Sequence, residues 1–242
     1  MKRRSFLAKT AGLAATMTAL PGLSRVLAED ASKTEAGRAL TTPNWKLKPP
    51  PGGRIPVAVA ISEGVTVIDF AGPWEVFQDT MVGDQMPFQL FTVAEKTEPL
   101  EGSAGLKLVP NHTFGNAPEC KVVVVPAQKG SAALHEWLRK ISKTADVTMS
   151  VCTGAFQLGR AGLLKGRRAT THHEFLDKLA KDFPETKVER DMRFVEGEKI
   201  STAGGLSSGI DLALRVVERY FGREAATRTA AYMEYQGQGW IT

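Results

Sequence analysis

The chain has 242 residues, of which 43% are hydrophobic and 24% are charged, and this ordinary globular composition excludes collagen-like, low-complexity and wholly disordered classes. The formal net charge is +5, but residues 1–28 hold five basic and no acidic side chains and account for the whole surplus. The rest of the chain therefore lacks the cationic excess of a nucleic-acid-binding protein. Two cysteines are too few for a disulfide framework, and a chain of this length buries a hydrophobic core without one.

Residues 1–28 have the features of an export signal. A basic start is followed by a mildly apolar stretch at 11–20 and by a small residue, Ala28, suited to a cleavage site. Residues 3–7 (RRSFL) resemble the twin-arginine motif. The apolar stretch is much shorter than the roughly 20 residues that span a bilayer, so no stable membrane anchor is expected. We expect a twin-arginine signal peptide and a periplasmic or otherwise exported protein; a disordered basic tail is the alternative.

Residues 29–53 are polar and end in three prolines and two glycines at 49–53. Such a segment offers too little apolar surface to offset the entropy lost on ordering. We expect it to be a linker or an N-terminal arm, and residues 54–242 to form the folded domain.

Short apolar runs and helical patterns alternate from residue 54 onward. The runs at 55–61 and 121–125 are apolar throughout, as in strands buried on both faces. A further apolar piece lies at 65–70, and Gly72-Pro73 is then predicted to open a helix, with Pro73 at its first position. In chain order, the other predicted elements are strands at 88–94, 106–109 (near a sheet edge), 147–151, 168–171, 188–190, 192–195 and 199–202, and helices at 72–80, 132–142, 155–164, 173–183, 208–221 and 223–235.

Strands and helices that alternate in this way predict an α/β fold, a flavodoxin-like three-layer sandwich with helices on both faces of a mostly parallel sheet. The last two predicted strands are expected to pair as a hairpin through Glu196-Gly197.

Cys152 lies where a predicted core strand ends and a helix begins. A side chain at this turn projects from the carboxyl edge of the sheet, where ligands bind in open α/β folds. The positive end of the following helix favours a thiolate, which predicts a pKa below the ordinary thiol value of about 8.5. Gly154 permits a tight turn, and the small residues after the cysteine are expected to leave amides free to hold an anion. A buried, inert cysteine is the structural alternative.

Three segments in collinear order resemble the ThiJ/PfpI family, which has a glutamine-amidotransferase-like fold. Residues 150–172 resemble its nucleophile segment, residues 67–77 its first helix entry, and residues 201–218 its late strand-to-helix segment. The resemblance extends over roughly residues 54–235 and is greatest to isonitrile hydratases and to the sensor domains fused to AraC-type regulators.

The resemblance implies that Cys152 is the nucleophile and that Asp69 lies beside it and transfers protons. Thr153 follows the nucleophile, where protease-like members have a histidine, so an adjacent Cys–His pair is absent. His172 corresponds to a histidine that several members keep near the sulfur. Carboxyl and imidazole groups suit proton transfer near neutral pH. The structural alternatives are a helix cap for Asp69 and a satisfied polar group at a strand end for His172.

Gly154, Ala127, Gln128 and Gly72 are expected to line the substrate and oxyanion site. The family usually has Pro-Gly-Gly where this chain has Pro126-Ala127-Gln128. Because alanine resists a positive φ, the Ala127 amide is expected to point away from the oxyanion site and Gln128 to fill part of the pocket.

Cys120 precedes one predicted strand and Cys152 follows another. If these strands are parallel neighbours, roughly 16 Å separates the two residues, beyond the limit of about 7 Å between the Cα atoms of a disulfide. Both thiols are therefore expected to be free.

Two functions remain open at this point. The resemblance favours an exported isonitrile hydratase-like enzyme, in which Cys152 adds to the isocyanide carbon and water releases an N-substituted formamide. The alternative is a non-catalytic ligand-binding or redox-sensing module, which the missing Gly-Gly favours. The expected partner is a small molecule and not nucleic acid, and relatives are commonly homodimers. No cofactor is expected, and the histidines show no metal-ligand spacing.

Overall fold

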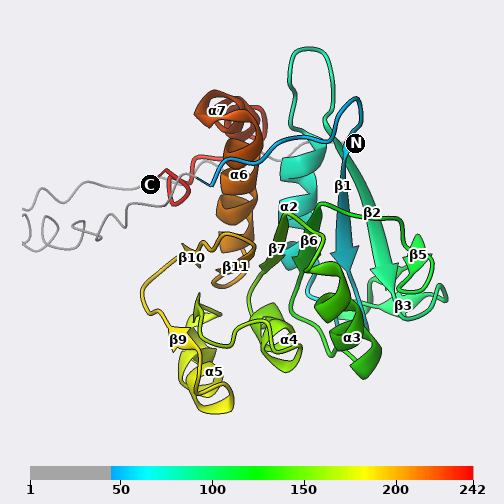
Figure 1. Cartoon of the computed structure of the whole chain (residues 1–242), viewed down its shortest axis with the longest axis vertical. Helices are drawn as coiled ribbons and strands as arrows, with labels where there is room; N and C mark the ends of the chain where they lie inside the picture. Colours follow the sequence, from blue (N-terminus) through cyan, green and yellow to red (C-terminus); the bar gives the residue numbers. More distant parts are fainter. Residues whose placement is uncertain (1–44, 242) are drawn as a thin grey trace, which may run out of the picture. The chain divides into compact units, whose positions relative to one another are not determined.

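The computed structural model describes residues 45–241, in which strands and helices alternate along the chain (Figure 1). The main sheet has the strand order β10-β11-β7-β6-β1-β2-β5. All its neighbours pair in parallel except β10, which is antiparallel to β11. These strands are β1 (Ile55–Ala60), β2 (Phe88–Ala94), β5 (His112–Thr113), β6 (Val122–Val125), β7 (Val147–Ser150), β10 (Phe194–Val195) and β11 (Ile200–Ala203).

Helices cover both faces of this sheet (Figure 1). In β1, Val57 and Val59 share one core with one helical layer, whereas Ala58 and Ala60 share a second core with the other layer. This alternation explains why the whole run is apolar, and it confirms the predicted three-layer α/β sandwich. The first layer consists of α2 (Val67–Gln78), α6 (Ser208–Phe221) and α7 (Arg223–Tyr232), and the second of α3 (Ala132–Ile141), α4 (Gly154–Arg160) and α5 (Leu176–Asp182).

The parallel strands bring their carboxyl ends to one edge of the sheet. The chain passes from β1 to β2 on one side and later returns to β6 on the other side of β1. Such a reversal of strand order leaves a crevice at the carboxyl edge, where ligands bind in open α/β sheets. The loops that follow β1, β6, β7 and β11 all meet at this edge.

Helix α2 begins earlier than the sequence predicts. The expected start at Gly72-Pro73 is wrong, because the helix starts at Val67. It includes most of the apolar piece at 65–70, and Pro73 lies in its interior. Proline has no amide hydrogen, so it gives no helical hydrogen bond to the carbonyl of Asp69, four residues earlier. The amide of Val67 finds a partner in the Ser103 hydroxyl, at 3.2 Å. As a result, Asp69 lies in the first turn of α2.

Several predicted elements differ in partner or in length. The predicted edge strand at 106–109 forms β4 (Lys107–Leu108), which pairs with β3 (Leu100–Glu101) outside the main sheet. β8 (Arg168–Ala169) and β9 (Lys187–Val188) form another separate pair. The helix predicted from 173 begins with the 3-10 turn η2 (His173–Phe175), and η1 (Ser103–Gly105) is a second such turn. The predicted hairpin is confirmed by the pairing of β10 with β11.

The two cysteines lie at opposite ends of neighbouring strands. β6 and β7 pair in parallel, Cys120 precedes β6, and Cys152 follows β7. Both thiols are free, which confirms the prediction.

The first described residues lie against α6. The Leu47 amide donates to the carbonyl of Arg219 at 2.8 Å, and the Arg219 guanidinium donates to the carbonyl of Trp45 at 2.9 Å and lies over the Trp45 ring. Part of the segment expected to be a linker or arm is thus packed on the domain. The expected export signal lies outside the described residues, and between 45 and 241 no helix combines the length and the hydrophobicity that crossing a bilayer requires.

Candidate active site

Cys152 lies on a sharp turn between β7 and α4. Its φ is 56°, in the left-handed region that non-glycine residues adopt at a cost of order 1–3 kcal/mol. Two hydrogen bonds hold the turn: the Cys152 amide donates to the carbonyl of Gly204 at 2.7 Å, and the Thr171 hydroxyl donates to the carbonyl of Cys152 at 2.8 Å. The predicted strand-to-helix turn therefore carries the cysteine, and the chain around it supports the strained backbone.

Gly154 makes this turn possible for a steric reason. A Cβ atom on Gly154 would lie 2.0 Å from the carbonyl oxygen of Val125, so α4 begins in direct backbone contact with the end of β6. Its amide donates to the carbonyl of Val151 at 2.9 Å. The expectation that this amide is free to hold an anion is therefore wrong, because the tight turn itself consumes it.

Asp69 is a fully buried carboxyl that reaches the site from α2. Its Oδ2 atom accepts a hydrogen bond of 3.0 Å from the amide of Ala127. Its Oδ1 atom is buried and has no hydrogen-bond partner of good geometry among the described residues. Burial raises the pKa of Asp69 from 3.8 to about 6, against the lowering effect of the Ala127 amide and of the Cys152 thiol.

Asp69 and Cys152 form a coupled pair. Burial, and next the negative charge of Asp69, raise the pKa of the Cys152 thiol above its ordinary value. The expectation of a resting thiolate is therefore wrong: the helix end does not outweigh the burial of the sulfur and a carboxylate beside it. The structure instead indicates a neutral thiol that donates to an ionised carboxyl, which makes Asp69 the natural acceptor of the thiol proton.

Three hydrogen-bond donors at the sulfur counteract the effect of burial and of the Asp69 charge on the pKa of Cys152. They are the backbone amides of Thr153 and Leu206 and the Thr153 hydroxyl, each of which acts to lower the pKa of Cys152. Leu206 has a φ of 52°, so its amide is held by a strained backbone of its own. Leu206 was not predicted from the sequence; the only signal was the Gly204-Gly205 pair before it, within the segment at 201–218 that resembles the family. These donors are placed to stabilise negative charge that develops on sulfur.

His172 lies near this turn but does not contact the sulfur. Its Nδ1 atom accepts a hydrogen bond of 3.3 Å from the amide of Glu174, and its ring lies against that of His173, with 4.3 Å between centroids and an interplanar angle of 31°. A Cβ atom on Gly205 would lie 2.4 Å from the His172 ring. No hydrogen bond joins His172 to Cys152 in the part of the chain that the structure describes. His172 thus lines a cavity and makes no direct contact with the thiol.

The remaining predicted site residues have separate positions. The Ala127 amide points to Asp69 rather than to an oxyanion site, as the alanine led us to expect. The Gln128 side chain donates to the carbonyl of Ala60 at 2.8 Å. Gly72 does not belong to the site: a Cβ there would lie 2.9 Å from the Ile210 side chain, so this glycine allows α2 to approach α6.

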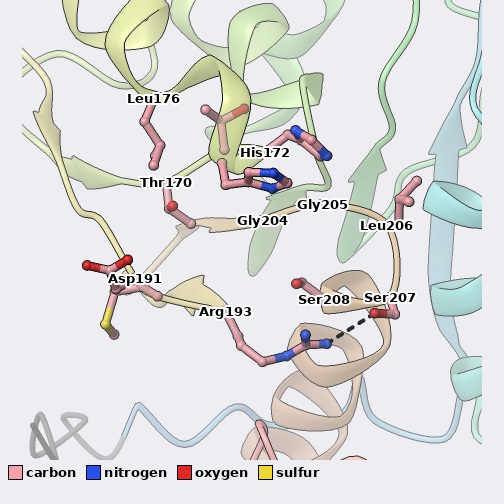
Figure 2. Close-up of a pocket in the computed structure, with 13 residues that line it drawn as sticks. Thr170, His172, Leu176, Asp191, Arg193, Gly204, Gly205, Leu206, Ser207 and Ser208 are labelled. Carbon is pink, nitrogen blue, oxygen red and sulfur yellow. Dashed lines mark hydrogen bonds between the residues drawn. The ribbon is translucent and has the colours of Figure 1, made fainter. Parts of the chain in front are cut away.

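Two cavities flank the Cys152 turn. The His172 cavity, of about 400 Å³, is lined by Thr170, Thr171, His172, His173, Leu176, Asp191, Met192, Arg193 and Gly204 to Ser208. Figure 2 shows the hydrogen bond of 3.4 Å that the Arg193 guanidinium donates to the Ser207 hydroxyl. The Thr153 cavity, of about 240 Å³, is lined by Gln128, Lys129, Thr153, Phe156, Gln157, Arg160, Phe175 and Lys178. Cys152 is only 8% exposed and lines neither cavity; its sulfur donors Leu206 and Thr153 line one each.

Comparisons with known proteins agree with this arrangement. The DJ-1/PfpI family profile matches residues 56–219, which include Asp69 and Cys152. The isonitrile hydratase of Pseudomonas putida is 33% identical over 180 residues, which are 71% of this chain and 74% of that protein. The HTH-type transcriptional regulator CdhR of Pseudomonas aeruginosa is 34% identical over 105 residues, 43% of this chain and 31% of the regulator.

Solved structures give the same result for the fold. A THiJ/PfpI family protein from Pseudomonas syringae is 28% identical, with a TM-score of 0.68, and the match covers 83% of this chain and 81% of that chain. An AraC family transcriptional regulator from Pseudomonas putida, 20% identical with a TM-score of 0.66 over 74% of this chain and 99% of that chain, shares the fold.

Proposed function

This chain belongs to the DJ-1/PfpI family, and from that premise we propose that it is a cysteine-dependent enzyme that hydrates small isocyanides to N-substituted formamides. The observation that carries the proposal is the coupling of the buried Asp69 carboxyl to the Cys152 thiol. The similarity to an isonitrile hydratase supports the reaction class.

The first half of the reaction forms a bond between sulfur and carbon. Above a pH of about 6, Asp69 is ionised and Cys152 is a neutral thiol. As the sulfur attacks the terminal carbon of R–NC, Asp69 accepts the thiol proton and delivers it to the same carbon. The product is a thioimidate, R–N=CH–S–enzyme. The donors from Thr153 and Leu206 stabilise the charge on sulfur during this step.

The second half consumes one water molecule. The water oxygen bonds to the thioimidate carbon, and its protons pass to the nitrogen and, through Asp69, back to the sulfur. The carbon–sulfur bond then breaks, which regenerates the thiol and releases R–NH–CHO. Isocyanide and water thus give the formamide without net oxidation or reduction.

Replacing the nucleophile tests this proposal. Cys152→Ala is expected to lower kcat for cyclohexyl isocyanide by at least about 1,000-fold, because no covalent intermediate forms. Cys120→Ala is the matched control, since Cys120 is also a buried free thiol but lies at the other end of the sheet. Formamide production followed by proton NMR measures both rates. Full turnover by Cys152→Ala would contradict the mechanism.

A non-catalytic ligand-binding or redox-sensing module is the second candidate. Asp69 consumes the Ala127 amide, so that donor is not available to an oxyanion, and the similarity to transcriptional regulators supports this alternative. It predicts that mild peroxide converts Cys152, and not Cys120, to a sulfinic acid detectable by mass spectrometry. It also predicts that the protein turns over no isocyanide, amide or aldehyde.

We further propose that residues 1–28 direct export through the twin-arginine pathway and that the mature protein is a homodimer. The support for export is the basic start, the RRSFL segment and the short apolar stretch. The homodimer rests on family resemblance, and sedimentation velocity measures it directly.

A further inference from the structure

All the charged side chains that line the Thr153 cavity are cationic. Three of its lining side chains, Lys129, Arg160 and Lys178, are cationic, and no acidic side chain lines it. The His172 cavity differs, since it contains Asp191 beside Arg193, and the Arg193 guanidinium already donates to Asp211 at 2.5 Å. Cations gathered in a cleft whose own lining holds no carboxylate attract small anions.

Two of the three cations are available to a ligand. Lys129 and Arg160 are exposed and make no ion pair within residues 45–241. Lys178 is partly engaged, because it donates to Asp182 at 2.8 Å and lies 5.9 Å from the centroid of the Phe156 ring. A guanidinium with free donors is suited to bind a carboxylate with two parallel hydrogen bonds.

Two aromatic side chains also line this cavity. The rings of Phe156 and Phe175 meet edge to face with 6.4 Å between centroids, and Phe175 is 38% exposed despite its apolar character. Gln128 adds a polar side chain, whose Oε1 atom is buried without a hydrogen-bond partner among the described residues. The lining therefore offers an aromatic wall and three cationic side chains in a volume of about 240 Å³, which is small compared with drug-binding pockets.

Thr153 connects this cavity to the reactive sulfur. Its amide and hydroxyl both donate to Cys152, while its side chain lines the cavity. We infer that the Thr153 cavity binds the substituent of the substrate, and that this substituent is an apolar or aromatic group that carries a carboxylate. The carboxylate lies against Arg160 and Lys129, and the reactive end lies toward Thr153 and the sulfur. Its role as a substrate site rests on the proposed function; the binding of a carboxylate does not.

Binding of two matched probes to Cys152→Ala protein, which cannot turn over, tests the inference. Phenylacetate and phenylacetamide have nearly the same shape and differ in charge. By isothermal titration calorimetry at low salt, phenylacetate is expected to bind at least about tenfold more tightly, as for a charge-assisted hydrogen bond. Its affinity is expected to fall as NaCl is added. Equal affinities for the two probes would overturn the inference.

Charge-removing variants locate the site. Arg160→Gln and Lys129→Gln are each expected to weaken phenylacetate binding several-fold and to leave phenylacetamide binding unchanged. Arg167→Gln is the control, because Arg167 is exposed and lines none of the described cavities. An unchanged phenylacetate affinity in both Arg160→Gln and Lys129→Gln would overturn the inference. Inorganic phosphate that binds as tightly as phenylacetate would do so too, because the aromatic wall would then contribute nothing.

A turnover experiment separates this inference from the proposed function. With the otherwise unaltered enzyme, 4-isocyanobenzoate is expected to show a lower KM than phenyl isocyanide, and Arg160→Gln is expected to remove this difference. If no isocyanide is hydrated while phenylacetate binding depends on Arg160, the proposed function fails and the carboxylate site stands. If both isocyanides are hydrated with equal KM, the substrate class assigned to this cavity fails and the proposed function stands.

Discussion

At the scale of single residues, Asp69 and Cys152 are the pair on which the proposed chemistry depends. The fold buries the Asp69 carboxyl completely yet gives it one backbone donor, Ala127, and the thiol as a neighbour. The outcome is an acid that changes charge close to neutral pH, next to a thiol that does not. Such a pair suits proton transfer during attack better than a permanently ionised sulfur does.

The raised pKa of Asp69 predicts the pH dependence of activity. Asp69 must be ionised to accept the thiol proton, and its pKa is about 6. We therefore expect kcat/KM for an isocyanide to fall by about tenfold per pH unit below this value. Asp69→Asn is expected to lower kcat/KM by at least about 100-fold and to abolish this acid limb. A wild-type profile that is flat between pH 5 and pH 8 would contradict the role of Asp69.

The raised pKa of Asp69 also predicts how stability depends on pH. Activity is expected to rise with pH, whereas the free energy of unfolding is expected to fall. Its folded-state pKa, about 6, exceeds the ordinary 3.8, so in this window the folded protein binds more protons than the unfolded chain. Stability contributed by protonated Asp69 is therefore lost as the pH rises through about 6. Asp69→Asn is expected to raise the free energy of unfolding at pH 7.5 by about 1–3 kcal/mol, and by much less at pH 4. Urea denaturation at the two pH values measures this, and destabilisation at pH 7.5 would contradict it.

At the scale of elements, the site depends on the short distance between the start of α4 and the end of β6. The carbonyl of Val125 lies where a side chain on Gly154 would have to be. The loop after β6 carries Ala127, whose amide holds Asp69, and the turn after β7 carries Cys152. The contact at Gly154 thus sets the distance between the loop that holds Asp69 and the turn that carries Cys152.

Gly154→Ala tests this contact. Because a Cβ atom would lie 2.0 Å from the Val125 oxygen, the backbone must move, and we expect a loss of about 3 kcal/mol or more in the free energy of unfolding. Activity is expected to fall with it. The control is Gly53→Ala, where no atom lies within 4 Å of the added Cβ. Urea denaturation that gives the two variants equal stability would contradict the steric argument.

Element boundaries show where sequence patterns are informative. β1, β2, β6 and α6 lie within a residue of their predicted bounds, because long apolar or amphipathic runs report burial directly. The start of α2 was wrong, because Pro73 is an ordinary signal of a helix start and here lies inside the helix. What permits this is the tertiary environment, including the Ser103 hydroxyl that receives the Val67 amide.

At the scale of the whole molecule, parallel topology assembles the site from distant parts of the chain. Asp69 follows β1, Ala127 follows β6, Cys152 follows β7, and Leu206 follows β11. These four strands are consecutive neighbours in the sheet. Their carboxyl ends therefore bring four short segments to one place, although 137 positions separate Asp69 from Leu206.

The proposed export depends on residues 1–28, so it is tested with the full-length protein. Replacing Arg3 and Arg4 by lysine in the full-length protein is expected to abolish twin-arginine export in a bacterial host, because that pathway reads the arginine pair. Fractionation with immunodetection measures the distribution between periplasm and cytoplasm. A wild-type protein that remains cytoplasmic, or export that persists in the variant, would contradict the proposal. The domain fold is expected to be the same in the wild type and in the variant.

Apolar runs, helix periodicity and a cysteine two residues before a glycine are local features of the chain, so the fold class, the family and the turn that carries Cys152 could be predicted from the sequence. It also indicated Asp69, but only through family resemblance. The raised pKa values of Asp69 and Cys152, the hydrogen bond from the Leu206 amide to the sulfur and the packing of Gly72 against Ile210 depend on the tertiary structure. These three features have the same cause. Burial, the sharing of a hydrogen-bond donor and the distance between backbones depend on residues that are remote in the chain and adjacent only after folding.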